Sequence, residues 1–115
     1  MDGERLKILR KEKQLTQQQL AQHIGVGDST IRMIEINKRN GSIEVLSALS
    51  DFFDVSMDFL EGKTEYRNSF EIAKEIVNQL KKLNLIKNDS ELNNEIIELI
   101  TKHVSKNIII DKHLD

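Results

Sequence analysis

Apolar side chains recur at helical spacing along most of the chain, with polar side chains between them. In the first sixty residues this pattern breaks into five short segments, which predict helices over about residues 3–13, 16–24, 28–36, 42–53 and 56–61. In the fourth segment, for example, Leu46, Leu49 and Phe53 are three and four residues apart and predict one buried face. The pattern is typical of a small all-α domain.

Capping and stop signals mark the ends of several segments. Thr16 can cap the second helix with its hydroxyl, and Gln19 follows three residues later, where a capping box takes Glu or Gln. Gly25 comes where this helix must end and turn, because glycine adopts a positive φ without steric cost. Ser42 and Ser56 are the expected caps of the fourth and fifth helices.

A second helical part follows a polar connector at residues 63–68. Its pattern predicts one helix to about residue 85 and another after a turn at residues 88–90, so that the two form an αα-hairpin. We therefore expect a first domain at residues 1–66 and a helical segment at 67–115. The apolar stripes of this hairpin, which continue to Val104, contain Phe70, Ala73, Ile76, Val77, Leu80, Leu83, Leu92, Ile96, Leu99 and Ile100.

Two helices with one wide apolar face cannot bury that face alone. We expect the hairpin to pack against its copy in a second subunit, which predicts a homodimer and leaves higher oligomers open. The alternative is that the hairpin covers its own first domain, in which Ile8, Phe52 and Phe59 do not fit the predicted core.

Residues 16–36 predict two short helices joined by a tight turn. Small Ala21 lets the helices pack closely, Val26 can fill the crevice at the turn, and Ile31 and Ile34 form the buried pair of the second helix. A helix pair with a polar outward face is a shape that enters the major groove of DNA. The outward positions of the second helix are Asp28, Ser29, Thr30, Arg32 and Met33.

Composition excludes several other classes of protein. The chain has no Cys and no Pro, so it has no disulfides and no thiolate metal site. His23, His103 and His113 have no partner four residues away, and we expect no metal. Without a glycine-rich phosphate loop or a catalytic triad, the sequence predicts neither an enzyme nor a cofactor.

The amino terminus is charged and has no apolar core of a signal peptide. The longest apolar run, 108–110, is far too short to span a bilayer. The expected location is cytoplasmic, with no membrane partner.

Charge is distributed unevenly, although the net charge is only −2. Residues 1–41 hold eight basic and five acidic side chains, whereas residues 42–66 hold one basic and six acidic side chains. Phosphate attraction depends on the local patch rather than on the sum, so the first helices are the side expected to face DNA. The carboxylates of residues 42–66 are expected to form a solvated face.

The first sixty residues resemble the phage-repressor-like (XRE/Cro) helix-turn-helix family. The resemblance is carried by RLKILRKEKQLTQQQLAQHIGVGDSTIRMIE and by IEVLSALSDFFDVSMDFLEG, and it covers five helices in order. It implies an ion pair between Arg10 and Glu35, and base contacts from Asp28, Ser29, Arg32 and Met33. It also implies backbone phosphate contacts from Gln17, Thr30, Lys38, Arg39 and Asn40, with Gln17 bracing the recognition helix.

Side-chain chemistry agrees with parts of this assignment. Arg32 could bind guanine O6 and N7 in a bidentate manner, and Met33 could pack against a thymine methyl group. Asp28 could either accept from a cytosine N4 or cap its helix. The chain departs from common family usage at Gly27, where a hydroxyl cap is usual, and at Met33, where a more polar reader is usual, so the operator sequence stays open.

These features predict a dimeric repressor of a prophage, phage or mobile element that binds an inverted-repeat operator. The segment after residue 66 is too short for a self-cleaving protease domain, so induction would need an antirepressor, an external protease or a peptide. The alternative is an antitoxin that sequesters a protein toxin and regulates its own operon. A module that has kept the fold without DNA binding is disfavoured by the basic face.

Overall fold

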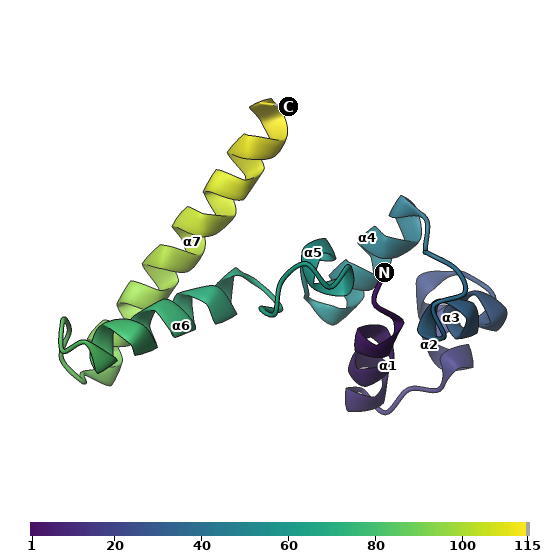
Figure 1. Ribbon diagram of the computed structural model, residues 1–115, viewed down its shortest axis with the longest axis horizontal. Helices are drawn as coiled ribbons and strands as arrows, with labels where there is room; N and C mark the ends of the chain where they lie inside the picture. Colours follow the sequence, from purple (N-terminus) through teal and green to yellow (C-terminus); the bar gives the residue numbers. More distant parts are fainter. Residues whose placement is uncertain (115) are drawn as a thin grey trace. The chain divides into compact units, whose positions relative to one another are not determined.

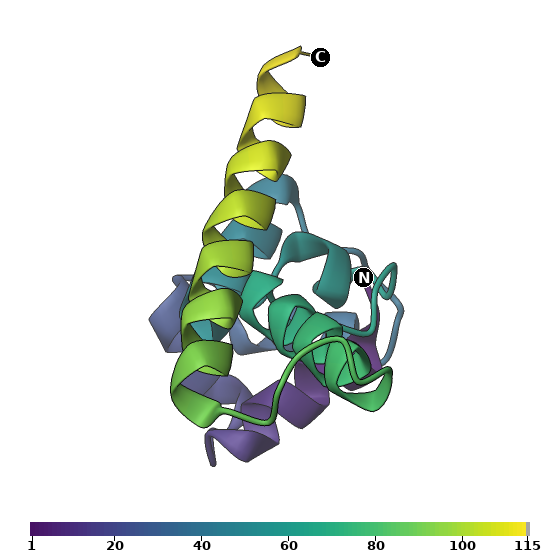
Figure 2. The same cartoon turned by 90° about the vertical axis from the view of Figure 1, so that its left-hand side faces the viewer.

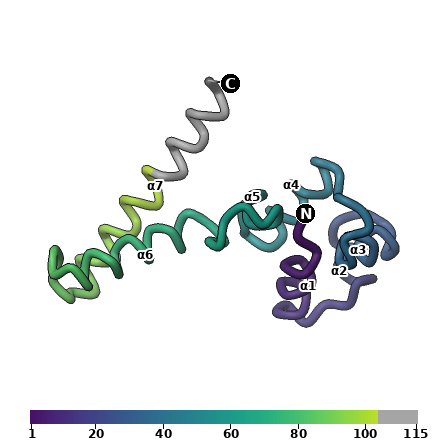
Figure 3. The backbone as a smooth tube through the Cα atoms, in the orientation of Figure 1, coloured from purple at the N-terminus to yellow at the C-terminus, as the bar shows by residue number. Residues whose placement is uncertain are grey.

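The computed structural model describes the backbone of residues 1–114 and the side chains of residues 1–103, and in this part of the chain it contains helices and no strands (Figure 1). The predicted all-α class is therefore confirmed. The chain divides into two compact units, Met1–Arg67 and Asn68–Asp115. Figure 3 traces the backbone through both units.

The first unit contains five helices: α1 (Gly3–Glu12), α2 (Gln17–Ile24), α3 (Asp28–Glu35), α4 (Ile43–Phe53) and α5 (Met57–Leu60). All five contribute to one apolar core, and α2 packs beside α3. Burial of these side chains provides the main stabilisation of so small a unit. The core residues are Leu6, Leu9, Leu20, Ala21, Ile31, Ile34, Leu46, Leu49, Phe53, Val55, Phe59 and Leu60.

The caps fall where the sequence places them. The Thr16 hydroxyl accepts a hydrogen bond from the Gln19 backbone N–H at 3.0 Å, and the Gln19 side chain accepts one from the Thr16 N–H at 2.9 Å. Gly25 ends α2 with φ 82°, a left-handed conformation that suits glycine. Ser42 and Ser56 cap α4 and α5 through their hydroxyls.

Phe59 was expected outside the core, and this expectation is wrong. Its ring belongs to the apolar core and is buried, and two guanidinium groups lie over it, Arg5 at 4.4 Å and Arg67 at 5.8 Å from the ring centroid. Phe52 is half-buried, with the His23 ring 5.1 Å away. Of the three unassigned apolar residues, Ile8 stays exposed.

The segment after α5 is the last part of the first unit and contacts α1 and α5. The Ser56 backbone N–H donates to the Arg67 carbonyl at 2.7 Å, and Arg5 donates to the carbonyls of Phe59 and Thr64. The Arg67 guanidinium also donates hydrogen bonds to both carboxylate oxygens of Glu12 in α1. We call residues 61–67 the strap, because these contacts fasten it to α1 and α5.

The second unit is a hairpin of α6 (Ser69–Lys82) and α7 (Ser90–Leu114). The two helices lie side by side near the turn that joins them (Figures 1 and 2). The predicted first helix ends three residues earlier than expected, because Asn84 adopts a left-handed φ of 56° and the Leu85 N–H closes the turn onto the Leu80 carbonyl at 3.0 Å. The Val104 and His113 side chains lie outside the described residues.

Among the side chains of the hairpin that the structure describes, up to residue 103, few are fully buried. Ala73 and Val77 of α6 are buried, and on α7 Asn93 is only 2% exposed. Neither the amide nitrogen nor the amide oxygen of Asn93 has a hydrogen-bond partner within the described part of the protein. A buried amide without partners is destabilising.

Candidate DNA-binding surface

The turn between α2 and α3 places α3 with one face on the core and the other in solvent. Val26 is half-buried at the turn, and its N–H donates to the Ala21 carbonyl at 3.0 Å. Ile31 and Ile34 are fully buried. Of the outward positions expected to meet bases or phosphates, Asp28, Ser29 and Arg32 are exposed, whereas Thr30 and Met33 are half-buried.

A buried ion pair fixes the orientation of α3. The Arg10 Nε donates to Glu35 Oε2 at 2.7 Å, and its Nη2 donates to Oε1 at 3.0 Å. Arg10 also donates to the Leu15 carbonyl, and Gln17 Nε2 donates to Glu35 Oε1 at 3.2 Å. The hydrogen bond to Glu35 raises the pKa of the Arg10 guanidinium. The contacts of Arg10 and Gln17 with Glu35 join α1, α2 and α3.

The start of α3 shows whether Asp28 caps its helix, which is one of the two roles expected for it; the other is to accept from a cytosine amino group. Gly27 is the N-cap residue, and no side chain makes a capping hydrogen bond there. The exposed Asp28 carboxylate stands in the first turn, where the positive end of the helix dipole favours a negative charge. It therefore remains available to a cytosine amino group.

The loop after α3 carries the cations expected to meet phosphates. The backbone N–H groups of Lys38 and Arg39 both donate to the Met33 carbonyl, at 2.9 and 3.3 Å, which anchors the loop to the end of α3. Both side chains are exposed. Within the described residues, neither they nor Arg32 form an ion pair, so the three charges are available to DNA. Asn40 Oδ1 accepts from the Met1 amine at 3.1 Å.

Sequence reasoning missed two residues that hold this loop. Asn37 adopts a left-handed φ of 60°, and its Oδ1 accepts from the Gly3 N–H at 2.9 Å. Gly3 is buried so close to α3 that a Cβ there would lie 2.3 Å from the Ile34 carbonyl oxygen. An Asn directly after a helix was the available signal, because Asn tolerates this conformation. The hydrogen bond to Gly3 could not be predicted from the local sequence, because the two residues are 34 positions apart.

The opposite charge lies elsewhere on the first unit. The carboxylates of residues 42–66 are exposed, as expected: Glu44, Asp51, Asp54, Asp58, Glu61 and Glu65. Among the described residues no group of three or more His, Asp or Glu side chains could hold a metal ion. In that same part of the chain, no helix has the length and apolar character needed to cross a membrane.

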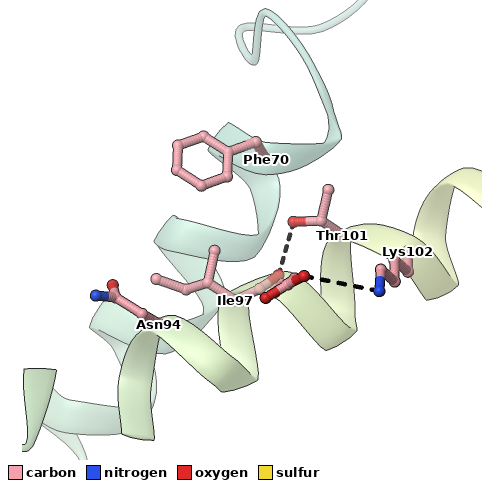
Figure 4. A pocket seen from close by; sticks show the side chains of 6 residues that line it. Phe70, Asn94, Ile97, Thr101 and Lys102 are labelled. Atoms are coloured by element: carbon pink, nitrogen blue, oxygen red, sulfur yellow. Dashed lines mark hydrogen bonds and ion pairs between the residues drawn. The ribbon is translucent and has the colours of Figure 1, made fainter. Parts of the chain in front are cut away.

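The residues expected at a subunit interface lie in the second unit. Ala73 and Val77 are buried within the hairpin itself, and Leu80, Ile96 and Ile100 are half-buried. The exposed members of the set are Phe70, Ile76, Leu83, Leu92 and Leu99. Phe70 lines an open pocket between α6 and α7 together with Ile97 and Thr101 (Figure 4).

Comparisons with known proteins agree with this geometry. Residues 6–60 match the helix-turn-helix family model. The chain is 31% identical to the uncharacterized HTH-type transcriptional regulator YqaE of Bacillus subtilis, over 97% of this chain and 100% of that protein. It is 28% identical to the HTH-type transcriptional regulator ImmR of B. subtilis, over 92% and 90% of the two chains. It is 33% identical to AnsR, an HTH-type transcriptional regulator of the same organism, over 88% and 89%. No solved structure matches.

Fold, site and relatives together define a DNA-binding regulator of transcription. The chain belongs to the XRE-type, phage-repressor-like helix-turn-helix family. This is a family of transcription regulators and not of enzymes.

Proposed function

We propose that the protein is a dimeric repressor of a prophage, phage or mobile element that binds an inverted-repeat operator in the cytoplasm. The observation that carries the proposal is the exposed cationic edge of α3 and the following loop, formed by Arg32, Lys38 and Arg39. Three exposed cations on a helix and loop that are held in place by the core and the Arg10–Glu35 pair are positioned to attract the phosphates of a DNA backbone.

In this mechanism the residues divide between positioning and reading. Lys38, Arg39 and Asn40 bind phosphates and set the register, and Gln17 and Thr30 add contacts at the ends of α2 and α3. The base edges are read by Asp28, Ser29, Arg32 and Met33. Gln17 also donates to Glu35, so the side chain that approaches the phosphate helps to hold α3 in place.

A dimer follows from the use of an inverted repeat. Two recognition helices about 34 Å apart enter successive major grooves on one side of the duplex. The bound dimer then excludes polymerase from an overlapping promoter. The exposed apolar side chains of the hairpin support assembly through the second unit.

A second candidate function is an antitoxin that sequesters a toxin and regulates its own operon. The open pocket beside Phe70 favours it, because it leaves room for a segment of a protein partner. An antirepressor or a protease could use the same place during induction of a repressor.

Footprinting on the DNA that flanks the gene tests the proposal. At near-physiological salt, we expect the full chain to protect an inverted repeat with half-sites about one helical turn apart. A folded protein that protects no site, with a stable complex formed instead with the product of a neighbouring toxin gene, would favour the antitoxin. Protection of a single half-site by a monomer would contradict the dimeric mode.

A further inference from the structure

The apolar side chains of the hairpin lie on two different sides of it. Successive residues of an α-helix are about 100° apart around its axis. On α6, Ile76 and Leu83 therefore lie to one side of the buried line through Ala73 and Val77, and Phe70 lies to the other side.

α7 divides in the same way about buried Asn93, with Leu92 and Leu99 on one side and Ile97 and Thr101 on the other. Because the helices run in opposite directions, the sides that carry Phe70 and Ile97 coincide, and these residues line one pocket (Figure 4). The remaining sides of the two helices must then coincide as well. We call this second side the heptad face: Ile76, Leu83, Leu92 and Leu99, which are 40%, 66%, 47% and 69% exposed.

The spacing on the heptad face is that of a helix–helix seam. On α6 the positions follow one another at intervals of four, three and four residues: Ile72, Ile76, Gln79 and Leu83. On α7 the same intervals separate Leu92, Ile96, Leu99 and His103. This is the repeat with which packed helices insert side chains between those of a partner.

Charges beside the α6 seam are self-complementary. Glu75 and Lys82 are seven residues apart and flank the seam on the side away from α7. When two copies of α6 pack antiparallel, Glu75 of one faces Lys82 of the partner subunit, and the two-fold axis repeats the pair. A surface on which opposite charges pair across a two-fold axis is expected where identical chains associate. A surface that binds an unrelated protein does not need this symmetry.

From these observations we propose that the heptad face binds a second copy of this chain, with the two α6 helices antiparallel and Glu75 opposite Lys82 of the partner subunit. The inference rests on the proposed function, which requires a dimer. A stable interface buries about 800 Å² on each partner. A helix of the length of α6 spans only about 21 Å, and Leu92 and Leu99 of α7 widen the seam toward that area.

Sedimentation of the full chain without DNA tests the face, with two matched substitutions. Leu83→Asp places a carboxylate in the seam and should raise the dimer Kd about a hundredfold. Leu85→Asp is the control, because Leu85 is equally exposed, at 67% against 66%, but lies in the turn after α6. Equal effects of the two variants, at unchanged helicity, would overturn the assignment of the face.

Charge reversal tests the antiparallel pairing. Lys82→Glu should raise the dimer Kd about tenfold through repulsion of Glu75 of the partner subunit, and adding Glu75→Lys to the same chain should restore it. Lys81→Glu imposes the same charge change on the last turn of α6 but points away from the seam, and should leave the Kd unchanged. A Lys82→Glu defect that Glu75→Lys does not reverse would overturn the pairing.

The outcomes separate this inference from the proposed function. A wild-type chain that sediments as a monomer and still protects an inverted repeat would overturn the heptad-face dimer and leave the DNA-binding regulator intact. A wild-type dimer that responds to Leu83→Asp but protects no DNA would support the face and contradict the repressor.

Discussion

The roles that we propose for two side chains of similar charge, one on α3 and one on the following loop, differ. Arg32 is exposed on the outward face of α3, whereas Lys38 lies on the loop that follows. A guanidinium reads guanine through two fixed hydrogen bonds, whereas an ammonium on a loop binds phosphate without regard to sequence.

Arg32→Ala should therefore cost about 1–3 kcal/mol of operator affinity and relax selectivity at one base pair. Lys38→Ala should weaken all sequences alike and reduce the salt slope of log K by about one. Binding isotherms on the operator, on single-base variants and at several salt concentrations measure both effects. If Arg32→Ala left the selectivity unchanged, the assigned register of α3 would be wrong.

Asn37 connects the loop after α3 to the first turn of α1. Asn37→Gly keeps the left-handed backbone conformation but removes the hydrogen bond to Gly3, so we expect a loss of stability of about 1 kcal/mol and a loss of operator affinity of about threefold to tenfold on every sequence. Asn84→Gly in the hairpin turn is the matched control, since Asn84 also has a positive φ. Equal DNA affinity of both variants and wild type would show that the loop needs no such anchor.

At the scale of elements, the strap fastens the end of the first unit to its first helix. The sequence predicts a polar connector at residues 63–68, and the structure fastens much of it to α1 through Arg67 and Glu12. The hydrogen bond from Arg67 lowers the pKa of the Glu12 carboxyl below its ordinary value. A lowered pKa means that the folded state binds this proton less readily than the unfolded state, so the stabilisation is present above the ordinary carboxyl pKa and is lost as the pH falls through the folded value.

Glu12→Gln should consequently remove part of the acid sensitivity of the first unit. We expect wild type to be more stable by about 0.5 kcal/mol at pH 7, as for other exposed ion pairs, and the difference to disappear between about pH 5 and pH 3. Urea unfolding at several pH values measures it, with Glu65→Gln as an exposed carboxylate control. A constant difference across this pH range would argue against the ion pair as its cause.

Local signals predicted the elements better than the contacts between them. The capping box at Thr16, the left-handed Gly25 and the two serine caps were readable because each involves residues within one turn. The burial of Phe59 could not be predicted from its own helix, since Arg5 and Arg67, which lie near its ring, come from other segments of the chain. The interaction of Gly3 with Asn37 spans 34 positions and is equally invisible in the sequence.

The whole molecule consists of two compact units that the chain joins at residues 67 and 68. The first has a core formed by five helices, whereas few side chains in the described part of the hairpin are buried. Because association stabilises only the unit that makes the interface, the two units should differ in their response to protein concentration.

Thermal unfolding should therefore show two transitions rather than one. The Tm of the hairpin transition should rise by several degrees over a hundredfold increase in protein concentration, and that of the first unit should stay constant. Calorimetry at several concentrations, repeated with Leu83→Asp, measures this. A single concentration-independent transition would contradict both the independence of the units and the dimer.

The buried side chain of Asn93 bears on how fast the protein is degraded in the cell. Within the described part of the chain its buried side-chain amide has no hydrogen-bond partner, which costs the isolated hairpin about 1–3 kcal/mol. Segments of low stability open often, and proteases act on the opened form. We expect monomers to be degraded faster than dimers. Protein made in excess of what dimerises is then removed, and this limits the cellular concentration of the regulator.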